Sequence, residues 1–195
     1  MADVAGEREI IFTGIGGQGI QLMAKILAET VVREGRYAML FGVYMGMMRG
    51  GPSESTVVVG DQPIDTPPIV PLCWGVVAMH PQGLDEMAAK LRPGGLLFAN
   101  ETLVTQAPRP DVRLLGVPAT RLADQAGNIA GAGMVLLGAF VAATGLVAID
   151  GVVATMRAAL PAHRQARADE NARLLALGAA TVASYGTVSL TPATA

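Results

Sequence analysis

A glycine-rich turn between an apolar run and a helical pattern limits the fold of this chain more than any other feature. The turn, Gly14-Ile15-Gly16-Gly17-Gln18-Gly19, follows the apolar run 9–13 and opens a helical pattern. Strand, glycine turn and helix in this order form a corner that binds nucleotides or phosphate groups. We expect Gly14 to permit the tight turn, Gly16 to let the backbone approach a ligand, and Gly19 to let the helix pack on the strand. The N–H groups at the helix N-terminus would then favour an anion.

The acid with which NAD-binding corners usually hold the ribose is missing from its expected place. It is an Asp or Glu about 20 residues after the turn, at the end of the second strand. The second predicted strand here, 36–44, ends without an acid, and Glu34 precedes it. These residues favour a phosphate-bearing ligand other than NAD. A glycine turn that only packs a helix on a sheet is the alternative.

The order of apolar patterns along the chain predicts an α/β fold with a Rossmann-like, mostly parallel sheet flanked by helices. The 195 residues are enough for a single domain, with a core over about 8–185 and a tail over 186–195. The last third is helical and is expected to cover one edge or face of the sheet. The run 57–59 is of the kind buried in parallel sheets, and 92–98 is expected to hold a helix end, a turn and a strand. Strands are predicted at 8–13, 37–43, 55–60, 72–79, 95–100 and 112–117, and helices at 18–34, 82–92, 118–126, 129–145, 149–159 and 165–184.

The composition indicates a chain that shares surface with partners. Only 15% of residues are charged and 51% are hydrophobic, whereas about 25% charged residues is typical of soluble domains. The net charge of −2 makes nucleic acid an unsuitable partner. The uncharged segment 129–149 is long enough to cross a bilayer, but it is rich in Gly and Ala. We therefore expect a helix buried in a protein interface, and no membrane span.

Few residues in the chain are suited to binding metal or to redox chemistry. The chain has one cysteine, Cys73, whereas an iron–sulfur cluster needs four thiolates and a disulfide within the chain needs two. The two histidines, His80 and His163, are far apart in sequence and lack a ligand pattern. Any redox metal is therefore expected on another chain. The N-terminus has no signal-peptide layout, so a cytoplasmic location is expected.

Three blocks of the sequence together carry a resemblance to one family. The first is the glycine turn, and the second is Arg49-Gly50-Gly51 followed by Ser53. The third begins at Gly127-Asn128 and ends at Glu170-Asn171, and the stretch 91–95 adds support. Together they resemble the gamma subunit, or gamma domain, of the thiamine-diphosphate-dependent 2-oxoacid:acceptor oxidoreductases. The resemblance covers roughly residues 8–180.

The resemblance implies that the chain is one subunit of a larger enzyme. Such enzymes decarboxylate pyruvate, 2-oxoglutarate, or branched or aromatic 2-oxoacids to the acyl-CoA. Thiamine diphosphate with Mg²⁺ lies on the alpha and beta chains. Iron–sulfur clusters, including those of a delta or ferredoxin-like chain, pass electrons to ferredoxin or, through an extra flavin subunit, to NAD. The gamma unit is an α/β domain that helps to bind coenzyme A and packs against the alpha chain, and none of the metal groups is ligated by it.

Both the residues and the resemblance favour coenzyme A at the glycine corner. Its diphosphate suits the helix N-terminus, and the two glycines after Arg49 let that guanidinium turn toward a phosphate or carboxylate. No residue of the chain is assigned to catalysis. The expected cofactor-binding residues are Gly14, Gly16, Gly17, Gln18, Gly19, Arg49, Gly50, Gly51 and Ser53.

Several of these residues have structural alternatives. Gln18 would otherwise cap the helix, Arg49 would form a salt bridge to a neighbouring chain, and Ser53 would be a turn residue. Asn128 and Asn171 match positions of the family, but Asn128 after a glycine also has the properties of a helix N-cap. The arginine-rich stretch 157–173 is expected to be a solvated or inter-subunit helix face.

The stretch Tyr44-Met45-Gly46-Met47-Met48 departs from the pattern of the family. Many gamma units have a Tyr-Gly-Pro-Glu-like stretch here, and this chain has methionines in place of the acid. Methionine is flexible and makes favourable contacts with aromatic rings. The departure favours an aromatic 2-oxoacid such as phenylglyoxylate or indolepyruvate. Packing of the methionines in an inter-subunit contact is the alternative.

Two other functions fit parts of the sequence. One is a free NAD(P)-dependent Rossmann dehydrogenase, but the chain lacks the acid after the second strand and an evident catalytic constellation of His, Lys or Tyr. His80 is the only candidate, and a single histidine at a strand end is more often structural. The other is a purely structural assembly subunit whose glycine corner binds nothing.

Overall fold

The structure is a computed structural model that describes residues 6–44, 50–65, 67, 69–159 and 165–182. The expected tail, 186–195, lies outside the described residues, as do Arg49, His163 and the methionines at 45, 47 and 48.

The described chain forms one six-stranded sheet with the order β2-β3-β1-β4-β5-β6. β1, β4, β5 and β6 are parallel, whereas β3 is antiparallel to both of its neighbours. The mostly parallel α/β sheet is therefore confirmed, but the run 57–59 lies in its antiparallel strand. Val57, Val58 and Val59 are fully buried, so the apolar run reports burial on both faces and not strand direction. The strands are β1 Arg8–Ile15, β2 Tyr37–Tyr44, β3 Pro52–Gly60, β4 Cys73–Ala78, β5 Leu91–Asn100 and β6 Arg113–Val117.

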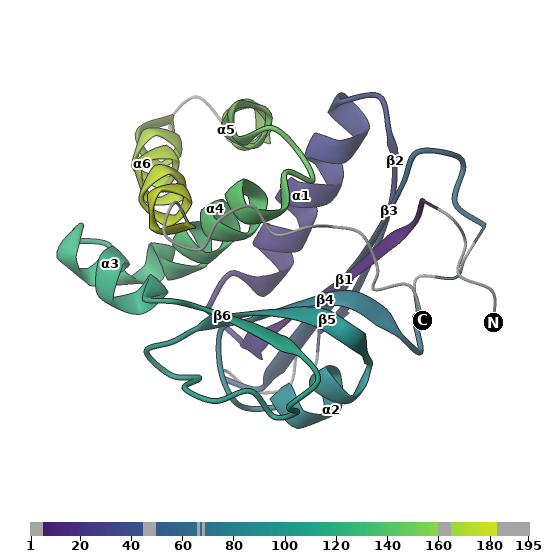
Figure 1. Cartoon of the computed structure of the whole chain (residues 1–195). Coiled ribbons are helices and arrows are strands. Elements are labelled where there is room, and N and C mark those ends of the chain that lie inside the picture. Colours follow the sequence, from purple (N-terminus) through teal and green to yellow (C-terminus); the bar gives the residue numbers. More distant parts are fainter. Residues whose placement is uncertain (1–5, 45–49, 66, 68, 160–164, 183–195) are drawn as a thin grey trace.

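Helices cover the two faces of the sheet unequally. In Figure 1, α1, α4, α5 and α6 lie on one side of the sheet and α2 lies on the other. Two core clusters correspond to these two faces, and the larger one joins the sheet to α1 and the C-terminal helices. The helical last third thus covers one face, as predicted. The helices are α1 Ile20–Arg33, α2 Leu84–Ala89, α3 Ala119–Gln125, the 3-10 turn η1 Ile129–Gly131, α4 Ala132–Thr144, α5 Ile149–Ala159 and α6 Gln165–Val182.

The apolar segment 129–149 is not one helix. It consists of η1, the helix α4, a loop that begins at Gly145, whose φ is 60°, and the first residue of α5. All residues of α4 except Ala142 are buried, and they pack against the sheet and against α6 of the same chain. The prediction of a helix buried between proteins was therefore wrong, because α6 supplies the covering surface. Within the described residues, no helix combines the length and the apolar character needed to cross a membrane.

The start of β5 differs from the predicted helix end and turn. Helix α2 ends at Ala89, and β5 already begins at Leu91, which pairs with Cys73. The register shifts before Gly75. Gly94, at φ 74°, donates its N–H to the carbonyl of Asp111 over 2.9 Å. The sequence 92–95 therefore forms an irregular stretch inside the strand and not a turn before it.

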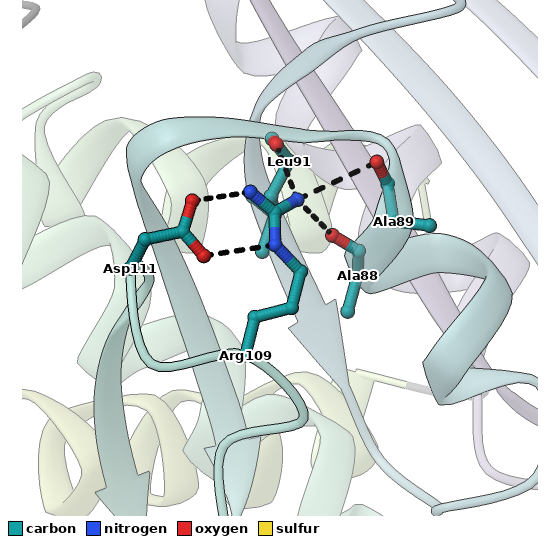
Figure 2. Close-up of polar contacts among 5 residues, drawn as sticks. All are labelled: Ala88, Ala89, Leu91, Arg109 and Asp111. Atoms are coloured by element: carbon teal, nitrogen blue, oxygen red, sulfur yellow. Dashed lines mark hydrogen bonds and ion pairs between the residues drawn. The ribbon is translucent and has the colours of Figure 1, made fainter.

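Arg109 fastens the long connection between β5 and β6 to the end of α2. Its guanidinium donates to the carbonyls of Ala88 at 3.1 Å and Leu91 at 2.9 Å, and it forms a two-bond ion pair with Asp111 (Figure 2). A cation at a helix C-terminus also stabilises the helix dipole. The hydrogen bonds from Arg109 hold the pKa of the Asp111 carboxyl below its usual range.

We expect Arg109→Ala to loosen this connection. The amide of Gly94, which donates to the Asp111 carbonyl, should exchange its hydrogen faster, as measured by hydrogen exchange on the full chain. The carboxyl pKa is lower in the folded state, so its stabilising contribution is complete above the unfolded pKa of about 4 and is lost as the pH falls through the folded pKa. The difference between wild type and variant should therefore shrink in acid. Arg121→Ala, which removes an exposed ion pair to Glu101, is the control and should leave this amide unchanged.

Candidate functional site

The glycine corner forms at the end of β1, but two of its glycines have exchanged the roles predicted for them. Gly17 and Gly19 have φ of 97° and 76°, and these left-handed residues make the turn. Gly14 lies inside β1, where an added Cβ would be 2.7 Å from the Gln18 side-chain oxygen and 2.8 Å from Cδ1 of Ile20. Gly14 therefore lets the helix pack on the strand, and Gly19 permits the turn. A Cβ at Gly19 would meet no atom within 4 Å.

Gly16 brings the first sequence block against the second. Its N–H donates to the carbonyl of Gly51 over 2.9 Å, and an added Cβ would lie 3.4 Å from the nitrogen of Gly50. Gly50, at φ 84°, makes the bend before β3. Gly16 thus lets two segments of this chain approach each other closely, whereas its approach to a ligand stays a prediction.

Ser53 and Gln18 do not have the structural roles given above as alternatives, those of a turn residue and a helix cap. Ser53 is buried inside β3 opposite Gly14, so it is a strand residue and not a turn residue. The residue that caps α1 is Gly19, without a side-chain hydrogen bond. Gln18 instead closes the turn, because its side-chain oxygen accepts from the N–H of Ile15 over 3.0 Å.

A cavity of about 400 Å³ opens beside this corner and joins it to the third block. Asn128 lies at its wall and caps η1, where its side-chain oxygen accepts from the N–H of Gly131 over 3.2 Å. The N-cap role predicted for Asn128 is confirmed. The cavity is lined by Gln18, Gly19, Leu22, Gly127, Asn128, Ala130, Gly131, Gly133, Met134, Arg167, Glu170 and Asn171.

The start of α4 lies directly on the glycine corner. An added Cβ at Gly133 would be 2.9 Å from the carbonyl oxygen of Gln18 and 3.2 Å from the sulfur of Met23. This close approach sets the cavity between the first turn of α1 and the start of α4. The first and third blocks, more than 100 residues apart in sequence, thus line one cavity together.

The cavity offers polar groups of both signs. Arg167 and Glu170 are exposed on α6, Asn171 is half-buried beside them, and the first turn of α1 faces the same space. Amide groups and an arginine beside a helix N-terminus suit a ligand with an anionic group and several hydrogen-bonding groups. The carboxylate of Glu170 would disfavour a second anionic group placed next to it.

The corner also lies at a position where open α/β sheets bind ligands. After β1 the chain passes into α1 on one face, and after the neighbouring strand β4 it passes into α2 on the other face. The carboxyl ends of two such strands border a crevice, which is the usual ligand site of the fold. Here β3 lies between β1 and β2, so the second strand is not the neighbour on which a ribose-binding acid is found in NAD-binding proteins.

Sequence reasoning missed two polar residues near this edge. Arg167 was assigned with its neighbours to a solvated or inter-subunit face, and it is exposed, but it also lines the cavity. Asn100, at the end of β5, is fully buried and donates to Met79 and Thr120, so it ties two strand ends to the start of α3. A single Asn directly after an apolar strand was the signal available for Asn100.

Cys73 and His80 lie in surroundings that indicate structural roles. Burial, followed by the charge of Glu9, raises the pKa of the Cys73 thiol to about 12, so the thiol stays protonated. His80 accepts from the N–H of Gln82 through Nδ1 over 3.1 Å. Among the described residues, no group of three or more His, Cys, Asp and Glu side chains could hold a metal ion.

The sheet and the glycine corner between β1 and α1 place the chain in the class of α/β domains with a mostly parallel sheet flanked by helices. Residues 9–181 match the family described as pyruvate ferredoxin/flavodoxin oxidoreductase. The chain belongs to this family, and its resemblance to the gamma unit is confirmed.

Known proteins of this family show the extent of the match. The chain is 32% identical to the ketoisovalerate oxidoreductase subunit VorA of Methanothermobacter thermautotrophicus over 89% of its own length, but it spans only 36% of that relative. It is 29% identical to the gamma subunit of a keto/oxoacid ferredoxin oxidoreductase from Geobacter sulfurreducens, with a TM-score of 0.79. This match covers 92% of this chain and 98% of the Geobacter chain.

A longer structure shares the fold alone. It is the 2-oxoglutarate:ferredoxin oxidoreductase from Magnetococcus marinus with 2-oxoglutarate, coenzyme A and succinyl-CoA bound, at 15% identity and a TM-score of 0.85. The match covers 94% of this chain and 32% of that one. Which of the nine expected residues contact a cofactor stays a prediction.

Proposed function

We propose that this chain is the gamma subunit of a multi-subunit, cytoplasmic complex that oxidatively decarboxylates a 2-oxoacid to its acyl-CoA. Electrons would pass to ferredoxin or, through a flavin subunit, to NAD. Thiamine diphosphate with Mg²⁺ and the iron–sulfur clusters would belong to the alpha, beta and delta or ferredoxin-like subunits. The names of the VorA relative and of the Geobacter gamma subunit support this proposal.

The observation that carries the proposal is the cavity shared by the first and third sequence blocks. It joins the N-terminus of α1 to Asn128, Arg167 and Asn171, and this set of groups suits the phosphate-bearing part of coenzyme A. Arg167 and the first N–H groups of α1 would hold the phosphates, and the two asparagine amides would bind the ligand's other polar groups. Coenzyme A supplies the thiol that accepts the acyl group, and this chain's residues would bind and orient it.

The metal groups do not fit the described part of this chain. Its one cysteine is buried and protonated, and the described residues contain no cluster of potential metal ligands. The proposal therefore gives this chain no step of the redox chemistry. Its tasks are the binding of coenzyme A and the assembly of the complex.

An aromatic 2-oxoacid is the substrate that the methionine stretch favours. This inference rests on Met45, Met47 and Met48, which lie outside the described residues. The VorA relative is named for ketoisovalerate, a branched aliphatic oxoacid. A panel of aromatic, branched and dicarboxylic oxoacids would compare these possibilities on the purified complex.

The direct test is affinity purification of the chain from its host, followed by identification of its partners and an oxoacid assay. Co-purified thiamine-diphosphate and iron–sulfur subunits with CoA-dependent oxoacid oxidation are the expected result. A chain that purifies alone and reduces NAD with a small alcohol would overturn the proposal in favour of a free dehydrogenase.

Arg167→Ala should weaken the use of coenzyme A by the assembled complex. Loss of a charge-assisted hydrogen bond to a phosphate should raise the KM for coenzyme A by roughly tenfold or more. The KM for the oxoacid should stay the same, because the substitution removes only a contact to the cofactor. Arg173→Ala is the matched control, since Arg173 is also exposed on α6 but does not line the cavity. Equal KM values for coenzyme A in both variants would remove Arg167 from the site.

A further inference from the structure

We infer that the outer edge of β2, with the groove between β2, α1 and α5, is the surface on which a partner subunit docks. The docked part is an extended segment that pairs with β2 and places apolar side chains and an acidic residue against this groove. The inference rests on the proposed function, since it names the place where the gamma subunit meets another chain of its complex.

Among the residues that the structure describes, the edge of β2 carries none of the protection that sheet edges usually have. β2 pairs with β3 along its whole length, from Tyr37 opposite Gly60 to Tyr44 opposite Ser53. Within the described residues, no strand pairs with its other side. The strand has eight residues and contains neither a charged residue nor a proline, whereas proteins usually shorten, charge or cover such edges to prevent pairing with other chains.

The opposite edge of the sheet shows the contrast. β6 has only five residues and begins with the exposed Arg113. Beside it, Glu101 and Arg121 form an exposed ion pair. The edge at β6 is therefore short and flanked by charges, whereas the edge at β2 is longer and apolar. The edge of β2 thus has the features of a contact surface.

Exposed apolar side chains surround this edge. The exposed fractions are 56% for Val32 on α1, and 45%, 44% and 37% for Tyr37, Leu40 and Phe41 on β2. Next to them lies a groove of about 650 Å³ between α1, β2 and the end of α5. An extended peptide that adds a strand gains affinity from main-chain hydrogen bonds and specificity from side chains that enter such grooves. The groove is lined by Lys25, Ala28, Glu29, Val32, Arg33, Ala38, Leu40, Ala158 and Ala159.

The charges at the groove favour a partner chain over a second copy. Lys25 and Arg33 lie at the rim with one acid, Glu29, which is 3.7 Å from Lys25. The rim is therefore net positive and complements a segment that carries an acid. A second copy would bring two positive rims together, and like charges at an interface suppress pairing.

The longer relative supports the same occupant. The chain spans only 36% of VorA, so in that protein the domain is joined to about twice its own length of further polypeptide. In a complex built from separate subunits, we place this further polypeptide on other chains. A partner segment is therefore available to cover an edge that the described residues of this chain leave exposed.

The first test is Leu40→Lys in the full complex, produced by co-expression of all subunits. A lysine would put a charged side chain into the apolar part of the groove, in addition to Lys25 and Arg33 at its rim, and should lower the fraction of assembled chain roughly tenfold, as measured by native mass spectrometry. Leu40→Ile should assemble as the wild type does. Leu103→Lys is the matched control, because Leu103 is similarly exposed at 43% but follows β5, and it should not change assembly.

A photo-crosslinking residue at position 41 tests the occupant even where Leu40→Lys fails to fold. Cross-links to an extended, acid-containing segment of another subunit support the inference. Cross-links to a second copy of this chain, or only to a segment without an acid, overturn it. If wild type and Leu40→Lys assemble equally, the docking surface alone is wrong. If the wild type assembles with no thiamine-diphosphate or iron–sulfur subunit, the proposed function fails together with it.

Discussion

Gly178→Ala is expected to lower the free energy of unfolding of the full chain by about 3 kcal/mol, because it forces two packed helices apart. An added Cβ on Gly178 would lie 1.8 Å from the carbonyl oxygen of Val135 and 2.9 Å from the nitrogen of Ala139. Both are backbone atoms of α4, so no rotamer change can relieve the contact. Urea unfolding followed by circular dichroism measures the difference.

The same crossing can be tested from the other helix. Gly138 on α4 faces α6 in the same way, and its added Cβ would lie 2.1 Å from the carbonyl oxygen of Leu175. Gly75→Ala is the control, since that Cβ would have a single neighbour, the Leu96 carbonyl at 3.8 Å, and the free energy of unfolding should stay within about 0.5 kcal/mol. A loss no greater for Gly178→Ala than for this control would show that α4 and α6 do not cross so closely.

Local patterns in the sequence were sufficient to place most of the helices and strands, but not the start of β5. The helix predicted at 18–34 is Ile20–Arg33, and it ends where Gly35 takes a φ of 80°. The strand predicted at 95–100 ends at Asn100 as expected, but begins earlier. Apolar periodicity and glycine punctuation depend on neighbouring residues, so they predict elements well and the partners of those elements poorly.

The order of the strands depends on contacts that local patterns do not contain. β3 returns beside β2 and inserts between β2 and β1. A buried antiparallel strand and a buried parallel strand can both have a continuous apolar sequence, so 57–59 could not reveal its direction. The missing acid counts against NAD only where the second strand lies beside β1, and in this chain β3 lies there instead.

The candidate site was predictable in its glycines and less so in its charges. The resemblance pointed to both Gly127-Asn128 and the glycine turn, and the cavity brings them together. Arg167 could not be singled out, because it is one of several arginines on an exposed stretch and only the fold shows which one faces the cavity. Gly14 and Gly19 were recognised as necessary, but the assignment of turn and packing needed the backbone angles.

Phe140→Ala should lower the free energy of unfolding of the full chain by about 4 kcal/mol, because it removes a fully buried ring from the centre of the larger core. The ring of Phe140 lies on α4 and meets three aromatic rings edge-on, each from a different strand of the sheet. The centroid distances are 6.2 Å to Phe12, 6.4 Å to Trp74 and 5.2 Å to Phe98. The measurement is again urea unfolding, and Leu177→Ala, at a side chain 38% exposed on α6, is the control with an expected loss below about 1 kcal/mol.

A double-mutant cycle separates the ring contacts of Phe140 from its burial. Phe98 is the nearest of the three rings, so Phe98→Leu and Phe140→Leu should be coupled by about 1 kcal/mol, the usual contribution of an aromatic pair beyond area burial. Leucine keeps most of the apolar volume, so each single variant should lose less than Phe140→Ala. A coupling near zero would mean that the ring stabilises the contact between α4 and the sheet by its volume alone. In that case Phe140→Leu should retain most of the wild-type stability, whereas Phe140→Ala should still show the full loss.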